Sequence, residues 1–272
     1  MAAPIPSGIA QMFDSYGRQA RLFPGLLTIF PPLLAVLAWC PWLLLSNVAA
    51  TLLTLAMSCG ILYALGSYAR TKGKRIEPRL LKSWGGWPTT LLLRHDSGLD
   101  QHTRQRYHTY LAKAVPGKLN FPTTQEEQDS PTVANQVYDS AVRWLKERAR
   151  SKEFSMVHRE NAQYGFRRNL LGLKPLALTL CILTIVLMTL AILNNIPDLV
   201  RFVMSGDLVA LTEVASNLGP AILSAFAINI FAVLVWFFVV TKRWVREAGD
   251  QYAYALLAVC DMTSSKTSGK AV

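Results

Sequence analysis

Histidines are the side chains of this sequence best suited to acid–base or metal chemistry, and they occur at His95, His102, His108 and His158. His102 and His108 are six residues apart, so they do not share a helix face at the i, i+4 spacing of a helical zinc pair. Asp96 follows His95 and could form a hydrolytic or metal site with it and His102, but solvated or capping polar residues account for the same pattern. We therefore expect no metal and no cofactor, and we keep a membrane enzyme that uses these histidines as an alternative.

The short motifs that position phosphates, dinucleotides, zinc or a nucleophilic serine are missing from the sequence. It contains no G-x-x-x-x-G-K-[ST], G-x-G-x-x-G, H-E-x-x-H or G-x-S-x-G segment. The four cysteines have neither metal-ligand spacing nor the pattern of a secreted disulfide framework; they are Cys40, Cys59, Cys181 and Cys260. We expect a protein that is not an enzyme.

Two compact segments are candidate interaction sites. Paired glycines followed by a proline predict a turn at residues 84–88, and its two tryptophans could lie flat on a bilayer or fill a small soluble core. Residues 160–169 place Glu160, Tyr164 and Arg167 or Arg168 on one helix face, where an ion pair can form. This second segment is either a charged collar beside a membrane span or a surface that docks between subunits or onto the tryptophan turn. The candidate docking residues are Trp84, Trp87, Glu160, Asn161, Tyr164, Arg167 and Arg168.

Long apolar segments dominate the elements that must position these residues. Residues 22–69 contain no charged side chain and no histidine, and residues 175–197 and 214–241 contain no charged side chain. A bilayer core about 30 Å thick needs roughly 20 apolar helical residues, so the first segment holds two spans. Because lipid leaves every backbone group to be bonded internally, the spans are expected to be helices. They are predicted at about 23–43, 47–68, 175–195 and 219–240.

The predicted fold is therefore an all-α membrane protein with two transmembrane helical hairpins and a helical cytosolic domain inserted between them. Its parts are a cytosolic N-terminal segment (1–21), hairpin 1 (22–69), a basic domain (70–174), hairpin 2 with an external loop at 196–218 (175–241), and a cytosolic tail (242–272). The basic domain holds 20 Lys and Arg against 10 Asp and Glu, whereas the external loop holds one basic and three acidic residues. The positive-inside rule then places both termini and the basic domain in the cytoplasm.

Local signals predict helices in the basic domain. Asp100 is placed as the N-cap of a helix that ends at Pro116-Gly117. Thr123 and Glu126 match a capping box, and Ser130-Pro131 opens a longer helix. Little of this segment alternates as a strand would, so the basic domain is predicted to be α-helical.

Helical periodicity resumes near Glu153 and can continue into the third span as one long helix. Gly172 and Pro175 are the positions where such a helix would hinge or kink.

Polar residues inside the spans suit helix packing better than transport. Asn229 is expected to bond between helices, and Ser58 and Gly60 offer a small-residue contact to a neighbouring helix. The predicted spans contain no Asp, Glu, Lys, Arg or His, whereas ion-coupled carriers place ionisable groups there. Coupled transport is therefore disfavoured.

Anionic membrane lipids are the expected partners of the basic charge. Lys and Arg next to a cytoplasmic leaflet gain about 1 kcal/mol each from anionic headgroups. This attraction accounts for the basic segments beside the spans at 70–82 and 159–174 without a nucleic acid, so nucleic-acid binding is disfavoured.

The stretches Arg70 to Thr90 and Glu160 to Lys174 resemble small, largely uncharacterised bacterial inner-membrane proteins with several spans. The resemblance covers the basic domain and the adjoining spans, and it implies a bacterial plasma membrane. It supplies no catalytic residues.

The function expected from these features is that of a non-enzymatic membrane effector or scaffold. Its cytosolic domain would sense a protein partner or ligand, and its spans would form a homo-oligomer that could permeabilise the bilayer. The alternative is a channel or transporter subunit with a pore lined by Ser, Thr and Asn.

Overall fold

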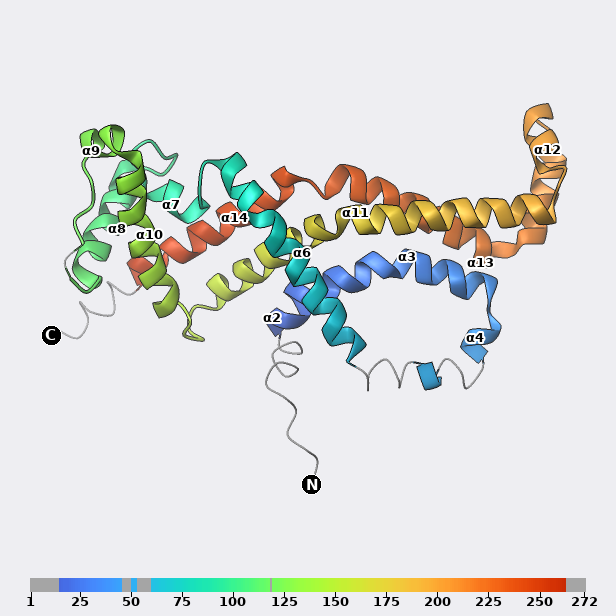
Figure 1. The fold of residues 1–272 in the computed structure, drawn as a ribbon, viewed down its shortest axis with the longest axis horizontal. Coiled ribbons are helices and arrows are strands. Elements are labelled where there is room, and N and C mark those ends of the chain that lie inside the picture. Colours follow the sequence, from blue (N-terminus) through green and yellow to red (C-terminus); the bar gives the residue numbers. More distant parts are fainter. Residues whose placement is uncertain (1–14, 46–49, 53–59, 118, 263–272) are drawn as a thin grey trace, which may run out of the picture. The chain divides into compact units, whose positions relative to one another are not determined.

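The computed structural model describes residues 15–45, 50–52, 60–117 and 119–262, and every regular element within them is a helix (Figure 1). The elements are α2 (Ser15–Gly17), η1 (Arg18–Leu22), α3 (Phe23–Trp39), α4 (Trp42–Leu45), α6 (Ile61–Trp84), α7 (Pro88–Leu93), α8 (Gln101–Ala114), α9 (Thr124–Asp129), α10 (Pro131–Arg148), α11 (Ser155–Asn195), α12 (Leu199–Ser205), α13 (Leu208–Leu234), η2 (Val235–Val239) and α14 (Lys242–Leu257). The predicted all-α class is confirmed for these residues.

Three of the described helical stretches are long and apolar enough to cross a membrane, which indicates a membrane protein. They are Arg18–Trp39, Ser155–Asn195 and Leu208–Val239. The first ends at Trp39, before the predicted limit of 43, and the third predicted span ends at Asn195 as expected. The fourth span was predicted to begin at residue 219, where Gly219 has φ 75° and interrupts α13. Residues 47–49 and 53–59 of the second predicted span, 47–68, lie outside the described residues, and its last part, from Ile61, is the start of α6.

The chain divides into two compact units. Unit 1 comprises the described parts of residues 1–75 and 166–241, and unit 2 those of 76–165 and 242–272. These limits differ from the predicted domain limits of 70 and 174, and the predicted tail is part of unit 2. The reason is packing between distant segments, because Leu256, Leu257 and Val259 are fully buried in the core of unit 2.

Unit 1 packs α3, α11 and α13 together through small and polar residues. Ala35, Met188 and Ala225, one from each helix, form a buried cluster. Asn229 is completely buried, and its Nδ2 donates to Pro31 O and to Ala225 O, both at 2.9 Å. The predicted bond between helices is thus present in the structure, from α13 to α3. It is the kind of polar contact that joins helices in lipid.

Helices α6 and α11 approach each other closely within unit 1. A Cβ on Gly172 would lie 2.6 Å from Gly73 N and 2.6 Å from the carbonyl carbon of Lys72. Gly172 was predicted as a hinge, but α11 is one continuous helix through it and the glycine serves this backbone contact. Asn169, three residues earlier, is buried and donates from Nδ2 to Ala20 O at 2.6 Å.

The helix contact that was predicted at Ser58 and Gly60 is not observed among the described residues. Ser58 lies outside the described residues. Gly60 has φ 67°, and no described neighbour lies within 4 Å of the position of a Cβ. Its place in the structure is a turn before α6, since glycine adopts a positive φ without steric cost.

Unit 2 is built on helix caps that the sequence predicted. The Asp100 side chain accepts from Thr103 N at 2.8 Å, and Thr123 and Glu126 form the complete capping box. α10 begins at Pro131 and buries Tyr138, Ala141 and Leu145. The caps at Asp100 and Thr123 fix where α8 and α9 begin, and the segments that precede these two helices contribute to the pocket described next.

Candidate functional site

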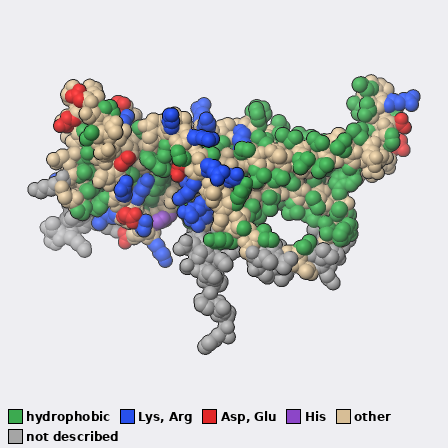
Figure 2. Space-filling view, in the orientation of Figure 1, with side chains coloured by type: hydrophobic (Ala, Val, Ile, Leu, Met, Phe, Trp, Pro, Cys, Tyr) green, Lys and Arg blue, Asp and Glu red, His purple; other side chains and the backbone are tan. Residues whose placement is uncertain are grey.

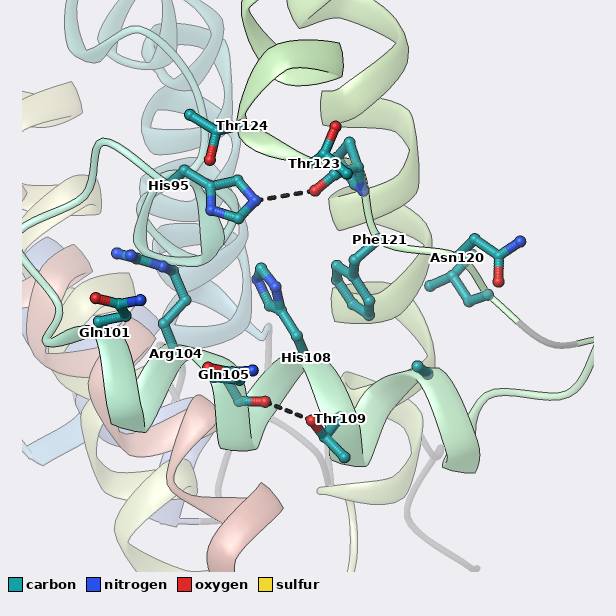
Figure 3. Close-up of a pocket in the computed structure, with 13 residues that line it drawn as sticks. His95, Gln101, Arg104, Gln105, His108, Thr109, Asn120, Phe121, Thr123 and Thr124 are labelled. Carbon is teal, nitrogen blue, oxygen red and sulfur yellow. Dashed lines mark hydrogen bonds between the residues drawn. The ribbon is translucent and has the colours of Figure 1, made fainter.

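A pocket of about 690 Å³ in unit 2 is the candidate functional site. Its walls are α8, the segment that follows α7, and residues 119–124 leading into α9. His95, Arg104 and His108 point toward the same space, and Phe121 closes one side of it (Figure 3). The structure therefore joins two of the histidines that the sequence singled out.

Helix α8 supplies a stripe of polar side chains to this pocket. The stripe consists of Gln101, Arg104, Gln105, His108 and Thr109, and Ala112 continues the same face. Their spacing of three and four residues is that of one helix face. Arg104 is not among the residues predicted from the sequence, although this polar periodicity beside the buried Tyr107 and Leu111 is the signal that points to it.

Both histidines of the pocket are held by backbone carbonyls. His95 Nε2 lies 2.9 Å from Pro122 O, and His108 Nε2 lies 2.8 Å from Leu93 O. Because a carbonyl oxygen only accepts, Nε2 carries the proton in each ring, and Nδ1 of the neutral ring is left as an acceptor. The ring centroids are 5.7 Å apart, and the His108 ring stacks on Phe121 at 4.3 Å. Burial lowers the pKa of His108, which favours the neutral imidazole.

Arg104 contributes a positive charge without an acidic partner among the described residues. Its Nη1 donates to Leu99 O at 3.2 Å and to Ser97 Oγ at 3.5 Å. None of the described residues that line the pocket is Asp or Glu, whereas three carry amides and three carry hydroxyls. The pocket is therefore electropositive and rich in neutral hydrogen-bonding groups.

Glu127 does not line the pocket, but its side chain holds the segment of His95 in place. Its carboxylate is buried and accepts from His95 N at 3.1 Å and from the Tyr138 hydroxyl. Burial and the hydrogen bond to Glu127 raise the pKa of Tyr138. The buried carboxylate thus ties α9, α10 and the His95 segment into one support.

His102 does not join the other two histidines. It lines a separate pocket with Arg106, Cys260 and Asp261, where Arg106 and Asp261 form an ion pair at 3.2 Å. A site built from His95, His102 and His108 together is therefore not formed. Within the described residues, no group of three His, Cys, Asp or Glu side chains could hold a metal ion.

The tryptophan turn is packed within unit 2. Positive φ angles at Gly85 (82°) and Gly86 (143°) establish the predicted turn. Arg246 of α14 lies 5.4 Å from the Trp84 ring centroid, and Lys146 of α10 lies 5.0 Å from that of Trp87. These cation–π contacts support the soluble-core alternative for the two rings.

Side chains of the second predicted docking segment, residues 160–169, contact several different partners. Glu160 pairs with the adjacent Arg159 at 3.1 Å, which is a different residue from the Arg167 or Arg168 that share its helix face. Tyr164 donates from its hydroxyl to Glu77 at 3.0 Å. A Cβ on Gly249 of α14 would lie 3.3 Å from Pro88 and 3.6 Å from the Tyr164 ring. The Tyr164 ring and the tryptophan turn therefore both pack against α14.

The remaining residues of this segment, Asn161, Arg167 and Arg168, differ in burial. Arg168 is buried and donates from Nε to Asn169 Oδ1 at 3.3 Å. Asn161 and Arg167 are half-buried on α11. Five of the seven predicted docking residues belong to unit 2, and Arg167 and Arg168 belong to unit 1.

Comparison of the chain with family models, with curated proteins and with solved structures finds no match.

Proposed function

We propose that the protein is a non-enzymatic membrane effector or scaffold of a bacterial inner membrane. Unit 2 would face the cytoplasm and sense a ligand or partner through its electropositive pocket, and the spans of unit 1 would form a homo-oligomer. The observation that carries this proposal is the distribution of side chains on unit 1, whose long helices expose apolar faces between two polar ends.

The apolar faces fit lipid contact. Phe30, Leu187 and Phe231, on α3, α11 and α13, are each more than half exposed. Figure 2 shows hydrophobic side chains spread over these three helices. Apolar side chains that are exposed along three helices mark a surface that contacts a membrane or another protein.

The two ends of unit 1 differ in charge. One end surrounds the close approach of Gly73 and Gly172, and Lys174 Nζ there donates to Phe237 O and Val240 O at 3.1 and 2.9 Å. The basic residues near this end are Arg18, Arg21, Arg70, Lys72, Lys74, Arg75, Arg167, Arg168 and Lys174. The acids of unit 1 in the described residues are Asp198, Asp207 and Glu213, at the α12 end. The positive-inside rule and attraction to anionic lipids both favour a cytoplasmic position for the basic end.

A fourth span between α3 and α6 is supported by the direction of the chain. Trp39, at the end of α3, packs with the cluster of Ala35, Met188 and Ala225. Leu65, in contrast, lies against Gly25 near the start of α3, where a Cβ on the glycine would be 2.5 Å from Leu65 Cγ. A span that leads from Trp39 back to Leu65 would agree with these two positions.

The topology can be tested with reporter fusions at Val115 and Asp207. We expect a fluorescent-protein fusion at Val115 to be active in the cytoplasm and an alkaline-phosphatase fusion at Asp207 to be active outside it, because the basic end is retained inside. The same two reporters exchanged between the sites are the control. The reverse pattern would contradict the orientation.

Reconstitution into liposomes tests the effector function against the channel. With the full chain at a rising protein-to-lipid ratio, we expect little ion flux at low ratios and a steep increase of dye release at high ratios, as oligomers form. Selective ion flux that is proportional to protein from the lowest ratio would instead identify a channel.

A further inference from the structure

We infer that the pocket between His95, Arg104 and His108 is a binding site for a small oxyanion of the phosphate or carboxylate class. This inference rests on the proposed sensing role of unit 2 and names the chemistry of its ligand.

The charge of the pocket favours an anion. Arg104 has hydrogen bonds only from Nη1 among the described residues, so Nε and Nη2 can donate to a ligand. A guanidinium presents its donors in a planar fork that matches two oxygens of a carboxylate or phosphate. An unpaired arginine beside a concave surface without acids is therefore suited to such an oxyanion.

Neutral groups around the arginine complete the site. Gln101 and Gln105 share the pocket face of α8 with Arg104, and Thr124 lines the opposite wall (Figure 3). The neighbouring Thr123 hydroxyl donates to Glu126 within the capping box and is not counted among the donors to a ligand. Amide N–H and hydroxyl groups donate to oxyanions without adding charge. The Phe121 ring, stacked on His108, provides an apolar surface for the uncharged part of a ligand.

Binding at this site should be linked to protonation of His108. The groups that face its ring are Arg104 on α8, His95 after α7, Glu127 on α9 and Tyr138 on α10. Burial, His95 and Arg104 lower the pKa of His108, and Glu127 raises it. A bound anion would add a second negative charge near the ring and would favour the imidazolium. The complex would then bind more protons than the free protein, so affinity should rise as the pH falls.

The test is equilibrium dialysis of the full chain in a neutral detergent against radiolabelled sulfate, which keeps its charge from about pH 8 to about pH 6, the range around the usual histidine pKa. We expect saturable binding that tightens as the pH is lowered. Arg104→Gln should weaken it at least about tenfold, the factor that corresponds to about 1.4 kcal/mol. His108→Gln keeps an N–H for Leu93 O but cannot become an imidazolium, so its binding should no longer tighten as the pH is lowered.

Arg150→Gln is the matched control, because Arg150 is an exposed arginine of unit 2 that does not line the pocket. Equal weakening by Arg104→Gln and Arg150→Gln, or binding without saturation, would overturn the site. Competition by inorganic phosphate but not by phosphatidylglycerol nanodiscs would identify a soluble ligand, and competition by the nanodiscs a lipid headgroup. Because dialysis in detergent needs no bilayer leak, failure here and failure of the liposome experiment are distinguishable.

Discussion

Gly172→Ala is expected to cause a marked loss of stability in unit 1. The added methyl group would lie 2.6 Å from Gly73 N and from the Lys72 carbonyl carbon, and 2.8 Å from Lys72 O. These are backbone atoms of α6, so no side-chain rotation can relieve the overlap and the two helices must separate. Overpacking of this kind costs about 1–3 kcal/mol. The measurement is the apparent Tm of the full chain in detergent together with its monodispersity in size-exclusion chromatography.

Two further variants make this result specific. Gly73→Ala should also lower the apparent Tm, because its Cβ would lie 2.9 Å from Asn169 Cα and closer still to Asn169 Oδ1. Gly98→Ala is the matched control, since no described heavy atom beyond its two chain neighbours lies within 4 Å of the added methyl group. If Gly172→Ala behaves like Gly98→Ala, then α6 and α11 do not cross at these glycines.

Glu127→Ala should destabilise unit 2 by a comparable or larger amount. It removes the acceptor shared by His95 N–H and the Tyr138 hydroxyl, and Tyr138 is completely buried. Each buried donor left without a partner costs about 1–3 kcal/mol. For a chain of this size, 1 kcal/mol corresponds to roughly 2–4 °C of Tm. Thermal unfolding of the full chain, followed by tryptophan fluorescence, measures the loss.

A double-mutant cycle separates this hydrogen bond from the lost side-chain volume. Tyr138→Phe removes one of the donors, so Glu127→Ala should cost less in the Tyr138→Phe background than in the original chain. Gln128→Ala, at an exposed position of the same short helix α9, should change the apparent Tm little. Strictly additive losses would show that Glu127 and Tyr138 do not stabilise each other.

The predictions that succeeded depend on neighbours in the chain. The start of α8 at Asp100 and the capping box at Thr123 require only residues three positions away. The apolar spans follow from composition over some 20 residues. The ion pair of Glu160 shows the limit of such rules, because its partner is the adjacent Arg159, a position that helical spacing does not favour.

The sequence by itself therefore determined an all-helical chain with membrane-spanning segments and a basic segment between them, since hydropathy, capping and charge are local properties. Only the tertiary structure decided that residues 255–260 complete the core of unit 2, and that Gly172 meets the backbone of α6. It also decided that His95 and His108 share a pocket with Arg104 while His102 faces another. These outcomes depend on which distant surfaces bury each other, and that choice is made by packing of the whole chain.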